Sequence, residues 1–407
     1  MNLSLRLKLS SMMFLEFFIW GSWFVTMGTF LAQAYKATGA QTGTAYNTQA
    51  IGAIVAPFIV GLIADRFFAA QKILGVLHLI GAGLLWFAST AANFDSFYPY
   101  IFIYMLLYMP TLALVNSVAF RHLADPATQF AQIRVLGTIG WIVAGLLIGS
   151  VFQWESSNLL HFTFQMAAAA SLALGVLSFF LPDTPPVVDK NSKVSLRDIL
   201  GLDAIGLLKD TRYLIFFISS ILICIPLAFY YQNANLFLNE VGVANAASKM
   251  SYGQVSETLF MLLLPIFIGR FGIKISLLVG MAAWVLRYTL FAYGDAGDKM
   301  WMLVLGIVLH GICYDFFFVT GQIYTNHKAG EKIKSAAQGL ITLATYGIGM
   351  MIGFSLAGKI SDQYAVTGGG HAWTNIWLIP AAIALGILVF FLIAFKDEKV
   401  SAEHLKH

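Results

Sequence analysis

The chain has 407 residues, of which 59% are hydrophobic and 11% are charged, and its mean hydropathy is +0.77. Soluble domains usually carry about 25% charged residues, so this composition excludes an ordinary soluble protein and indicates an integral membrane protein. The net charge of +4 is modest and forms no basic stripe along the sequence, so a nucleic-acid partner is not expected.

Apolar runs of about twenty residues, the length that crosses a bilayer as a helix, recur along the whole chain. The first run has a basic flank but no cleavage site of the usual kind, so we expect it to be retained as a helix. The pattern predicts an all-α membrane protein with twelve transmembrane helices, over residues 9–34, 43–64, 71–92, 97–120, 130–152, 160–181, 213–238, 248–269, 274–294, 300–324, 335–357 and 374–395.

The longest polar interruption separates two groups of six predicted helices. It begins near Pro182, Pro185 and Pro186, and its distal part alternates apolar and charged residues. This pattern fits either a short interfacial helix or a solvated linker. We therefore expect three parts, namely an N-terminal half over 1–182, a cytoplasmic linker over 183–210, and a C-terminal half with a short tail over 211–407.

Lys and Arg gather on one side of the predicted helices. If both termini are cytoplasmic, the inner loops hold most of them, and the outer loops and nearby helix ends hold only Lys36, Lys249, Lys299 and Lys359. This bias is the positive-inside pattern of membrane proteins. We therefore expect an even number of spans with both termini in the cytoplasm.

The loop after the second predicted helix carries a motif. It reads "GLIADRFFAAQKIL", and the loop after the eighth helix, "IFIGRFGIKISLL", repeats its order of Gly, Arg, Phe and Lys. Gly61, Asp65 and Arg66 match the G-x-L/I-x-D-R loop of the major facilitator superfamily, whose two six-helix halves also match the predicted layout. We expect these residues to gate or brace the helices without touching substrate.

Five ionisable side chains lie well inside the apolar runs: Glu16, Arg134, Glu257, Arg287 and Asp315. Such groups usually face a bundle interior or a water-filled cavity and mark transport pathways. For Glu16, a functional role and a place near the basic N-terminal flank are equally open. Arg287 is better explained as a charge partner or an outer-side anchor than as a direct substrate contact.

Arg134 is followed by Thr138 and Trp141, which lie four and seven residues later and therefore share its helical face. A cation, a hydroxyl and a large ring in one stripe suit a planar heterocyclic solute. The alternative is an Arg that extends to the inner surface.

Two acids of the C-terminal half have polar neighbours. Glu257 follows Gln254 on the same face, and Asp315 lies beside Tyr314 at the middle of its run. Acids at such depth suit reversible protonation, and either one is a candidate for the proton carrier. His310 fits either a proton shuttle or a hydrogen-bonded packing residue.

In the seventh run the sequence changes from aliphatic residues to "LAFYYQNANLF" after Pro226. Amide side chains are unfavourable on a helix face that contacts lipid, so this change favours a functional face. Tyr231, Gln232 and Asn235 are therefore added to the candidate substrate contacts.

Several ordered stretches resemble the nucleoside:proton symporter family of the major facilitator superfamily, and the likeness covers essentially the whole chain. They are "IRVLGTIGW" (133–141), "SETLF" (256–260), "RFGIK" (270–274), "WVLRYTLFAYGD" (284–295) and "YDFF" (314–317). The resemblance implies the major facilitator fold and the import of purine or pyrimidine nucleosides with protons by alternating access. It also implies a monomer in the bacterial inner membrane. The alternatives are a major facilitator transporter for another polar solute such as a sugar, and a polytopic membrane enzyme.

The resemblance also implies a substrate site, whose residues match Arg134, Thr138, Trp141, Gln254, Glu257, Tyr314 and Asp315. His310 stands where the family prototype has Tyr, and Glu16 stands where it has Gln. No P-loop, G-x-S-x-G or H-E-x-x-H motif occurs in the sequence, which disfavours ATP-driven pumping and enzymatic activity. The His and Cys residues are scattered, so neither a cofactor nor a metal is expected.

Overall fold

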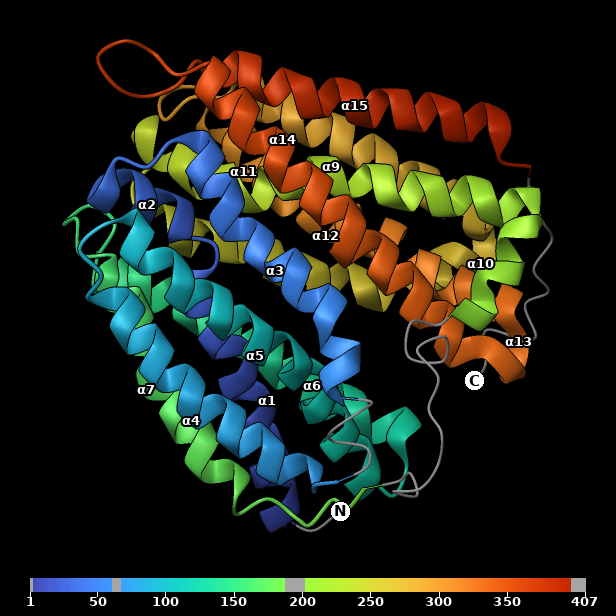
Figure 1. Ribbon diagram of the computed structural model, residues 1–407. Helices are drawn as coiled ribbons and strands as arrows, with labels where there is room; N and C mark the ends of the chain where they lie inside the picture. Colours follow the sequence, from blue (N-terminus) through green and yellow to red (C-terminus); the bar gives the residue numbers. More distant parts are fainter. Residues whose placement is uncertain (1–2, 61–66, 187–201, 397–407) are drawn as a thin grey trace. The chain divides into compact units, whose positions relative to one another are not determined.

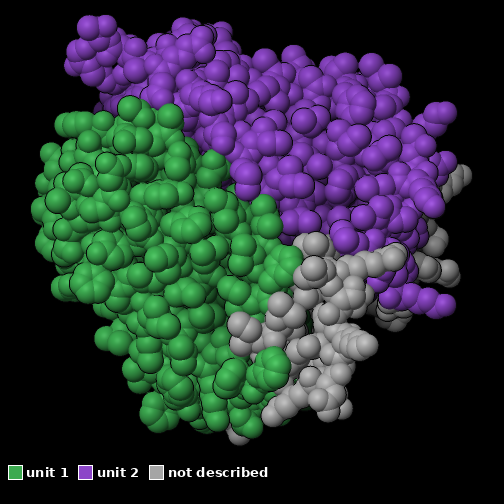
Figure 2. Space-filling view, in the orientation of Figure 1, with its two compact units in different colours: residues 1–194, 244–251 green, residues 195–243, 252–407 purple. Residues whose placement is uncertain are grey.

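The computed structural model describes residues 3–60, 67–186 and 202–396, and the chain divides into two compact units (Figure 2). Unit 1 comprises residues 1–194 and 244–251, and unit 2 comprises residues 195–243 and 252–407. The predicted gating residues Gly61, Asp65 and Arg66 lie outside the described residues.

Unit 1 is a bundle of helices (Figure 1), in which α1 packs against α6 and α7, α4 packs against α5 and α7, and α3 packs against α5. Capping boxes start two of these helices, because Thr38 and Asn93 each accept a hydrogen bond from the backbone N–H three residues later. The helices are α1 (Leu3–Trp23), α2 (Met27–Tyr35), α3 (Gly39–Ile59), α4 (Ala70–Ser89), α5 (Phe94–His122), α6 (Pro126–Leu146) with its π-helical continuation η2 (Leu147–Val151), and α7 (His161–Ser178).

Unit 2 is built around α9, which packs against α14, α15 and the π-helical segment η5. Its elements are the 3-10 helix η3 (Leu202–Lys209), α9 (Thr211–Glu240), most of α10 (Ala246–Tyr293), α11 (Met300–Val308), α12 (His310–Tyr314), the π-helical η4 (Asp315–Val319), α13 (Thr320–Thr342), η5 (Leu343–Gly349), α14 (Met350–Gln363) and α15 (Trp373–Ala394). Two glycines in left-handed conformations, Gly272 and Gly330, bend α10 and α13.

The structure confirms the twelve predicted helices within the described residues. Ten helices there are long and apolar enough to cross a membrane. The 48-residue α10 is two helices joined at Gly272, and the 21-residue α3 completes the set. The first predicted helix has a turn between α1 and α2, and the tenth is divided into shorter α and π segments.

The described end of the predicted linker is the 3-10 helix η3. Its Ala204 is buried against Ala337 and Leu340, which belong to α13. This part of the linker therefore packs on the protein, and residues 187–201 lie outside the described ranges.

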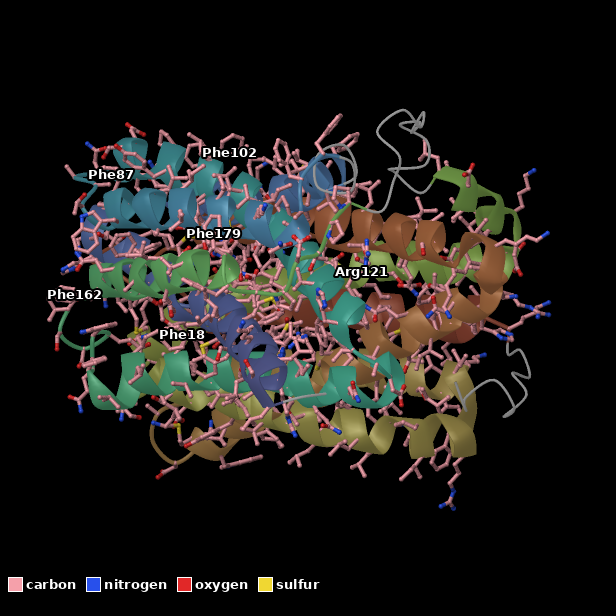
Figure 3. All side chains as sticks on the ribbon, turned by 90° about the horizontal axis from the view of Figure 1, so that it is seen from below. Phe18, Phe87, Phe102, Arg121, Phe162 and Phe179 are labelled. Atoms are coloured by element: carbon pink, nitrogen blue, oxygen red, sulfur yellow. The ribbon has the colours of Figure 1, made fainter. Side chains whose placement is uncertain are left out.

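The flanks of the helices are apolar. Figure 3 shows ring-bearing side chains along the helices of unit 1, among them Phe87 and Phe179, which are 56% and 50% exposed. In unit 2, Leu262 and Ile266 of α10 are more than two-thirds exposed. An apolar exterior of this extent is unfavourable in water and is solvated by the hydrocarbon of a bilayer.

Candidate functional site

The predicted stripe of unit 1 lies on α6, against α1. The guanidinium carbon of Arg134 lies 3.9 Å from the centroid of the Phe17 ring, a cation–π contact. Trp141 meets Trp20 edge to face, with 5.6 Å between ring centroids. Arg134, Thr138 and Trp141 are each only partly buried, so part of each residue stays exposed.

Glycines set how closely α1 and α6 approach in this region. A Cβ atom at Gly140 would lie 2.3 Å from the Phe14 carbonyl oxygen, and one at Gly21 would lie 2.9 Å from the Trp141 ring. Because no side chain fits at these positions, the two helices pack tightly and hold the Trp141 ring in place.

A second polar group of unit 1 surrounds Glu16, which is fully buried on α1. Its Oε2 lies 2.9 Å from His78 Nε2 on α4, and its Oε1 accepts a hydrogen bond from Thr111 Oγ1 at 2.6 Å on α5. The structure therefore gives Glu16 a buried partner instead of a place near the basic N-terminal flank. Sequence reasoning missed His78 because 62 residues separate the pair, and a lone His in an apolar run indicates no partner by itself.

In unit 2, Asp315 is the first residue of the π-helical segment η4 and is fully buried. Neither of its carboxylate oxygens has a hydrogen-bond partner among the described residues. Single π-helical turns inside α-helices are frequent at functional sites. Glu257 of α10 is close enough for its charge to act on Asp315.

Arg287 and His310 lie next to this acid pair. Arg287 is fully buried, its Nη1 lies 2.9 Å from His310 Nδ1, and its guanidinium carbon lies 3.5 Å from the centroid of the Tyr230 ring. The other ring nitrogen of His310, Nε2, lies 3.7 Å from Glu257 Oε2. Arg287 therefore holds the His310 ring, and its role as a charge partner of an acid stays a prediction.

The hydrogen bond to Arg287 fixes the tautomer of His310. A guanidinium can only donate, so His310 Nδ1 accepts and the ring proton is on Nε2, which faces Glu257. Close packing supports this arrangement, because a Cβ atom at Gly311 would lie 2.5 Å from the Ser256 carbonyl carbon. The Ser256 hydroxyl also donates to the Val308 carbonyl oxygen, which joins α10 to α11 directly before His310.

Aromatic hydroxyls complete this group. Tyr314, beside Asp315, shares a hydrogen bond with Tyr346 of η5 through their hydroxyl oxygens. Tyr231 of α9 is partly buried and lies within electrostatic range of Tyr314 and Glu257. Gln254, one helical turn before Glu257 on α10, is also partly buried.

The amides of α9 are engaged in helix packing. Oriented to satisfy both of its groups, the Gln232 amide donates to Phe354 O at 3.1 Å and accepts from Gly358 N at 3.2 Å, both on α14. Asn235 accepts a hydrogen bond at 3.3 Å from Asn239 on its own helix. The bonds of Gln232 account for this amide in an apolar helix through interhelical packing, whereas the bond of Asn235 lies within α9. Substrate contact by Gln232 and Asn235 stays a prediction.

Comparison with known proteins identifies the family. Residues 1–400 match the family model described as "Nucleoside H+ symporter". The chain is 44% identical to the putative nucleoside transporter YegT of Escherichia coli K12, over 96% of this chain and 93% of that protein. It is 36% identical to the xanthosine permease of the same organism, over 100% of this chain and 99% of that protein.

A solved structure matches along the same length. The crystal structure of the nucleoside transporter NupG superimposes with a TM-score of 0.87 at 33% identity, covering 98% of this chain and 100% of that chain. The helices described above accordingly take the major facilitator fold, and the alternatives of a major facilitator transporter for another polar solute or a membrane enzyme are not favoured. The chain belongs to the nucleoside:proton symporter family.

Proposed function

We propose that this chain imports purine or pyrimidine nucleosides by proton symport through alternating access. It does so as a monomer in the bacterial inner membrane, with both termini cytoplasmic and no enzymatic activity. The proposal is supported by the family match over residues 1–400 and by the apolar flanks of the helices. Its orientation follows from the positive-inside distribution of Lys and Arg.

The observation that carries the proton-coupled part is Asp315. An ionised carboxylate that is fully buried and lacks hydrogen-bond partners among the described residues is costly, and binding a proton removes that cost. Glu257 adds a second negative charge within range, which increases the benefit of a proton on the pair. Asp315 and Glu257 are thus the proposed proton carriers.

Glu257 is the member of the pair that a solute can reach, because its side chain is 21% exposed. The neutral His310 faces it with a ring N–H, and Arg287 holds the ring from the other side. This arrangement orients the Glu257 carboxylate and leaves it able to accept a hydrogen bond from a ribose hydroxyl. Glu257 can therefore release its proton and accept a hydrogen bond from the substrate instead.

A nucleoside offers a flat base, hydrogen-bonding edges and ribose hydroxyls, and each unit supplies matching groups. Trp141, Tyr231 and Tyr314 offer rings for stacking. Arg134, Thr138, Gln254, Glu257, His310 and Asp315 offer donors and acceptors. Gln232 can join them by releasing its present bonds to α14, and Asn235 is a further candidate. Gly61, Asp65 and Arg66 are proposed to gate or brace the helices.

The energy of one proton is sufficient for accumulation. Moving one charge inward across 100 mV releases about 2.3 kcal/mol, which corresponds to roughly a fiftyfold concentration of a neutral solute. A single proton per nucleoside is therefore enough for uptake against a gradient.

Uptake by purified protein in liposomes tests the proposal. With an inward proton gradient, labelled uridine or adenosine should accumulate above equilibrium, and a protonophore should abolish the accumulation. Unlabelled nucleosides should compete, whereas unlabelled sugars should not. Accumulation that persists with the protonophore would refute proton coupling, and competition by sugars would refute the substrate class. Chemical conversion of the solute would instead support the alternative of a membrane enzyme.

A further inference from the structure

Glu16 and His78 form a buried ionisable pair in unit 1 that the proposed proton step in unit 2 does not use. Four helices supply its groups: Glu16 from α1, His78 from α4, Thr111 from α5 and Ser171 from α7. Glu16 and His78 are 0% and 2% exposed. Besides the contact with Glu16 at 2.9 Å, His78 has its Nδ1 3.1 Å from the Ser171 hydroxyl oxygen. The pair therefore has hydrogen-bonding neighbours on both sides.

Counting hydrogens shows that this network has room for one extra proton. Ser171 has a single hydroxyl hydrogen, and its oxygen lies 2.9 Å from the His78 carbonyl oxygen, to which it donates. His78 Nδ1 must then donate to Ser171 Oγ. In a neutral ring the other nitrogen, Nε2, has no hydrogen, so its contact with Glu16 Oε2 requires a proton shared between the two side chains.

The network can also exist without that proton. If the Ser171 hydroxyl turns toward His78 Nδ1, the ring proton moves to Nε2 and donates to an ionised Glu16. Thr111 serves both states, because its hydroxyl oxygen lies 2.6 Å from Glu16 Oε1 and 2.5 Å from the Tyr108 carbonyl oxygen. Because the extra proton lies between Glu16 Oε2 and His78 Nε2, Glu16 Oε1 has no hydrogen in either state and accepts from the Thr111 hydroxyl in both. The two states differ by one proton and by rotation of the Ser171 hydroxyl.

Burial favours the state that holds the proton. With it the pair is neutral overall, and without it the pair carries one negative charge in surroundings from which water is excluded. Among the described residues, the ionisable groups near the pair include the phenols of Tyr104 and Tyr108 on α5, which interact with Glu16, and Arg134 on α6, which interacts with Tyr108. From α4 and α7 the facing groups are His78 and Ser171. Arg134 is thus the nearby cation that can stabilise the negative charge of the pair when the extra proton is absent.

Direct contacts connect the pair to the candidate substrate residues of the same unit. The residue after Glu16 is Phe17, whose ring lies under the Arg134 guanidinium. The Tyr108 hydroxyl donates to the Glu16 carbonyl oxygen at 2.7 Å. Trp20, one turn along α1, packs on both Tyr108 and Trp141. Gain or loss of a proton at Glu16 therefore acts on the side of α1 that supports Arg134 and Trp141.

We propose that Glu16 and His78 form a second proton-binding site, which takes up and releases one proton in each transport cycle in addition to the acid pair of unit 2. This inference rests on the proposed nucleoside:proton symport.

The test measures the number of protons moved per nucleoside from the reversal potential of uptake in liposomes. Glu16→Gln and His78→Gln should each still exchange nucleoside but move one proton fewer than the unmodified protein. The matched control is Glu240→Gln, because Glu240 and His371 form a pair of the same residue types at 3.0 Å that is partly exposed. This variant should keep the original number. An unchanged number in both Glu16→Gln and His78→Gln would overturn the proposal.

A second measurement keeps both ionisable side chains and applies even if Glu16→Gln or His78→Gln does not fold. In a pH titration followed by infrared spectroscopy, proton uptake by the pair should change a carboxyl band of Glu16 or an imidazole band of His78, and Thr111→Val should shift that band because it removes the hydrogen bond at Glu16 Oε1. If no pH-dependent carboxyl or imidazole band responds to Thr111→Val, the pair does not bind the proton and the inference fails. Absence of nucleoside-driven proton movement in the unmodified protein would instead refute the proposed function.

Discussion

Two buried acids of this protein, Glu16 in unit 1 and Asp315 in unit 2, meet the same energetic problem with opposite solutions. Glu16 has a hydrogen-bond partner for each carboxylate oxygen, His78 and Thr111. Asp315 has no such partner for either oxygen among the described residues. A satisfied acid is held in one geometry, whereas an unsatisfied one gains most from a proton or a ligand. Asp315 therefore gains more than Glu16 from binding a proton or from a hydrogen bond to a ligand.

The strongest test of this contrast removes the acids of unit 2. Asp315→Asn combined with Glu257→Gln should strongly reduce accumulation of nucleoside against a gradient, because no acid of that pair is left to bind a proton and only the proposed proton of Glu16 and His78 remains. Exchange of labelled for unlabelled nucleoside across the liposome membrane needs no net proton movement and serves as the control. Accumulation equal to that of the unmodified protein would contradict the assignment.

The second test removes Arg287, the buried cation that lies beside His310 in unit 2. Arg287→Gln should lower the stability to unfolding by about 2–5 kcal/mol, because it removes a desolvated cation–π contact and a charged hydrogen-bond donor. Arg287 lies over Tyr230 and holds His310, so both contacts are lost. Thermal unfolding of purified protein measures the change. The exposed Arg270 gives the matched control, and Arg270→Gln should have little effect.

The same two regions show how far the sequence predicts this protein. The lengths of the apolar runs predicted the helices, because crossing hydrocarbon requires a fixed length of helix. The positions of Glu16, Glu257 and Asp315 were visible as charges in apolar runs. The partners of Glu16 and Glu257 were not visible, since His78 and His310 meet these acids only through the packing of distant helices.

Local irregularities were also beyond the sequence pattern. The π-helical turn at Asp315 and the turn between α1 and α2 interrupt runs whose hydropathy is continuous. The amides of α9 show a further limit of sequence analysis. The sequence alone favours a functional role for Gln232, but the structure shows that its amide bonds to the α14 backbone. Periodicity indicates which face of a helix is polar, but tertiary packing decides whether that polarity is already used.

A smaller effect is expected from loosening the support of the satisfied acid. Gly140→Ala places a Cβ atom 2.3 Å from the Phe14 carbonyl oxygen, so α1 and α6 must separate, at a cost of about 1–3 kcal/mol. The shift should also weaken nucleoside binding, because Phe17 and Trp20 of α1 support Arg134 and Trp141. Thermal unfolding and substrate affinity measure the two effects. Gly83→Ala is the control, since its Cβ would meet no atom within 4 Å.

The smallest effect concerns Asp210, an acid outside the membrane-spanning segments that has partners but is not fully buried. It caps α9 through the backbone N–H of Arg212 at 2.8 Å, and its other oxygen accepts from Lys328 Nζ at 2.7 Å. The hydrogen bond from Lys328 holds the pKa of the Asp210 carboxyl below its ordinary value.

Because the pKa of Asp210 is lower in the folded protein than in the unfolded chain, its contribution to stability is full above the ordinary carboxyl range, near pH 4. The contribution is then lost as the pH falls through the folded pKa. Asp210→Asn keeps the cap but loses the charge, so it should lower the unfolding temperature slightly at neutral pH. Its difference from the unmodified protein should shrink as the solution is acidified. A difference that stays constant with pH would show that the ion pair with Lys328 does not contribute to stability. In that case, only the fully buried acids of this protein would be expected to affect its stability through their charge.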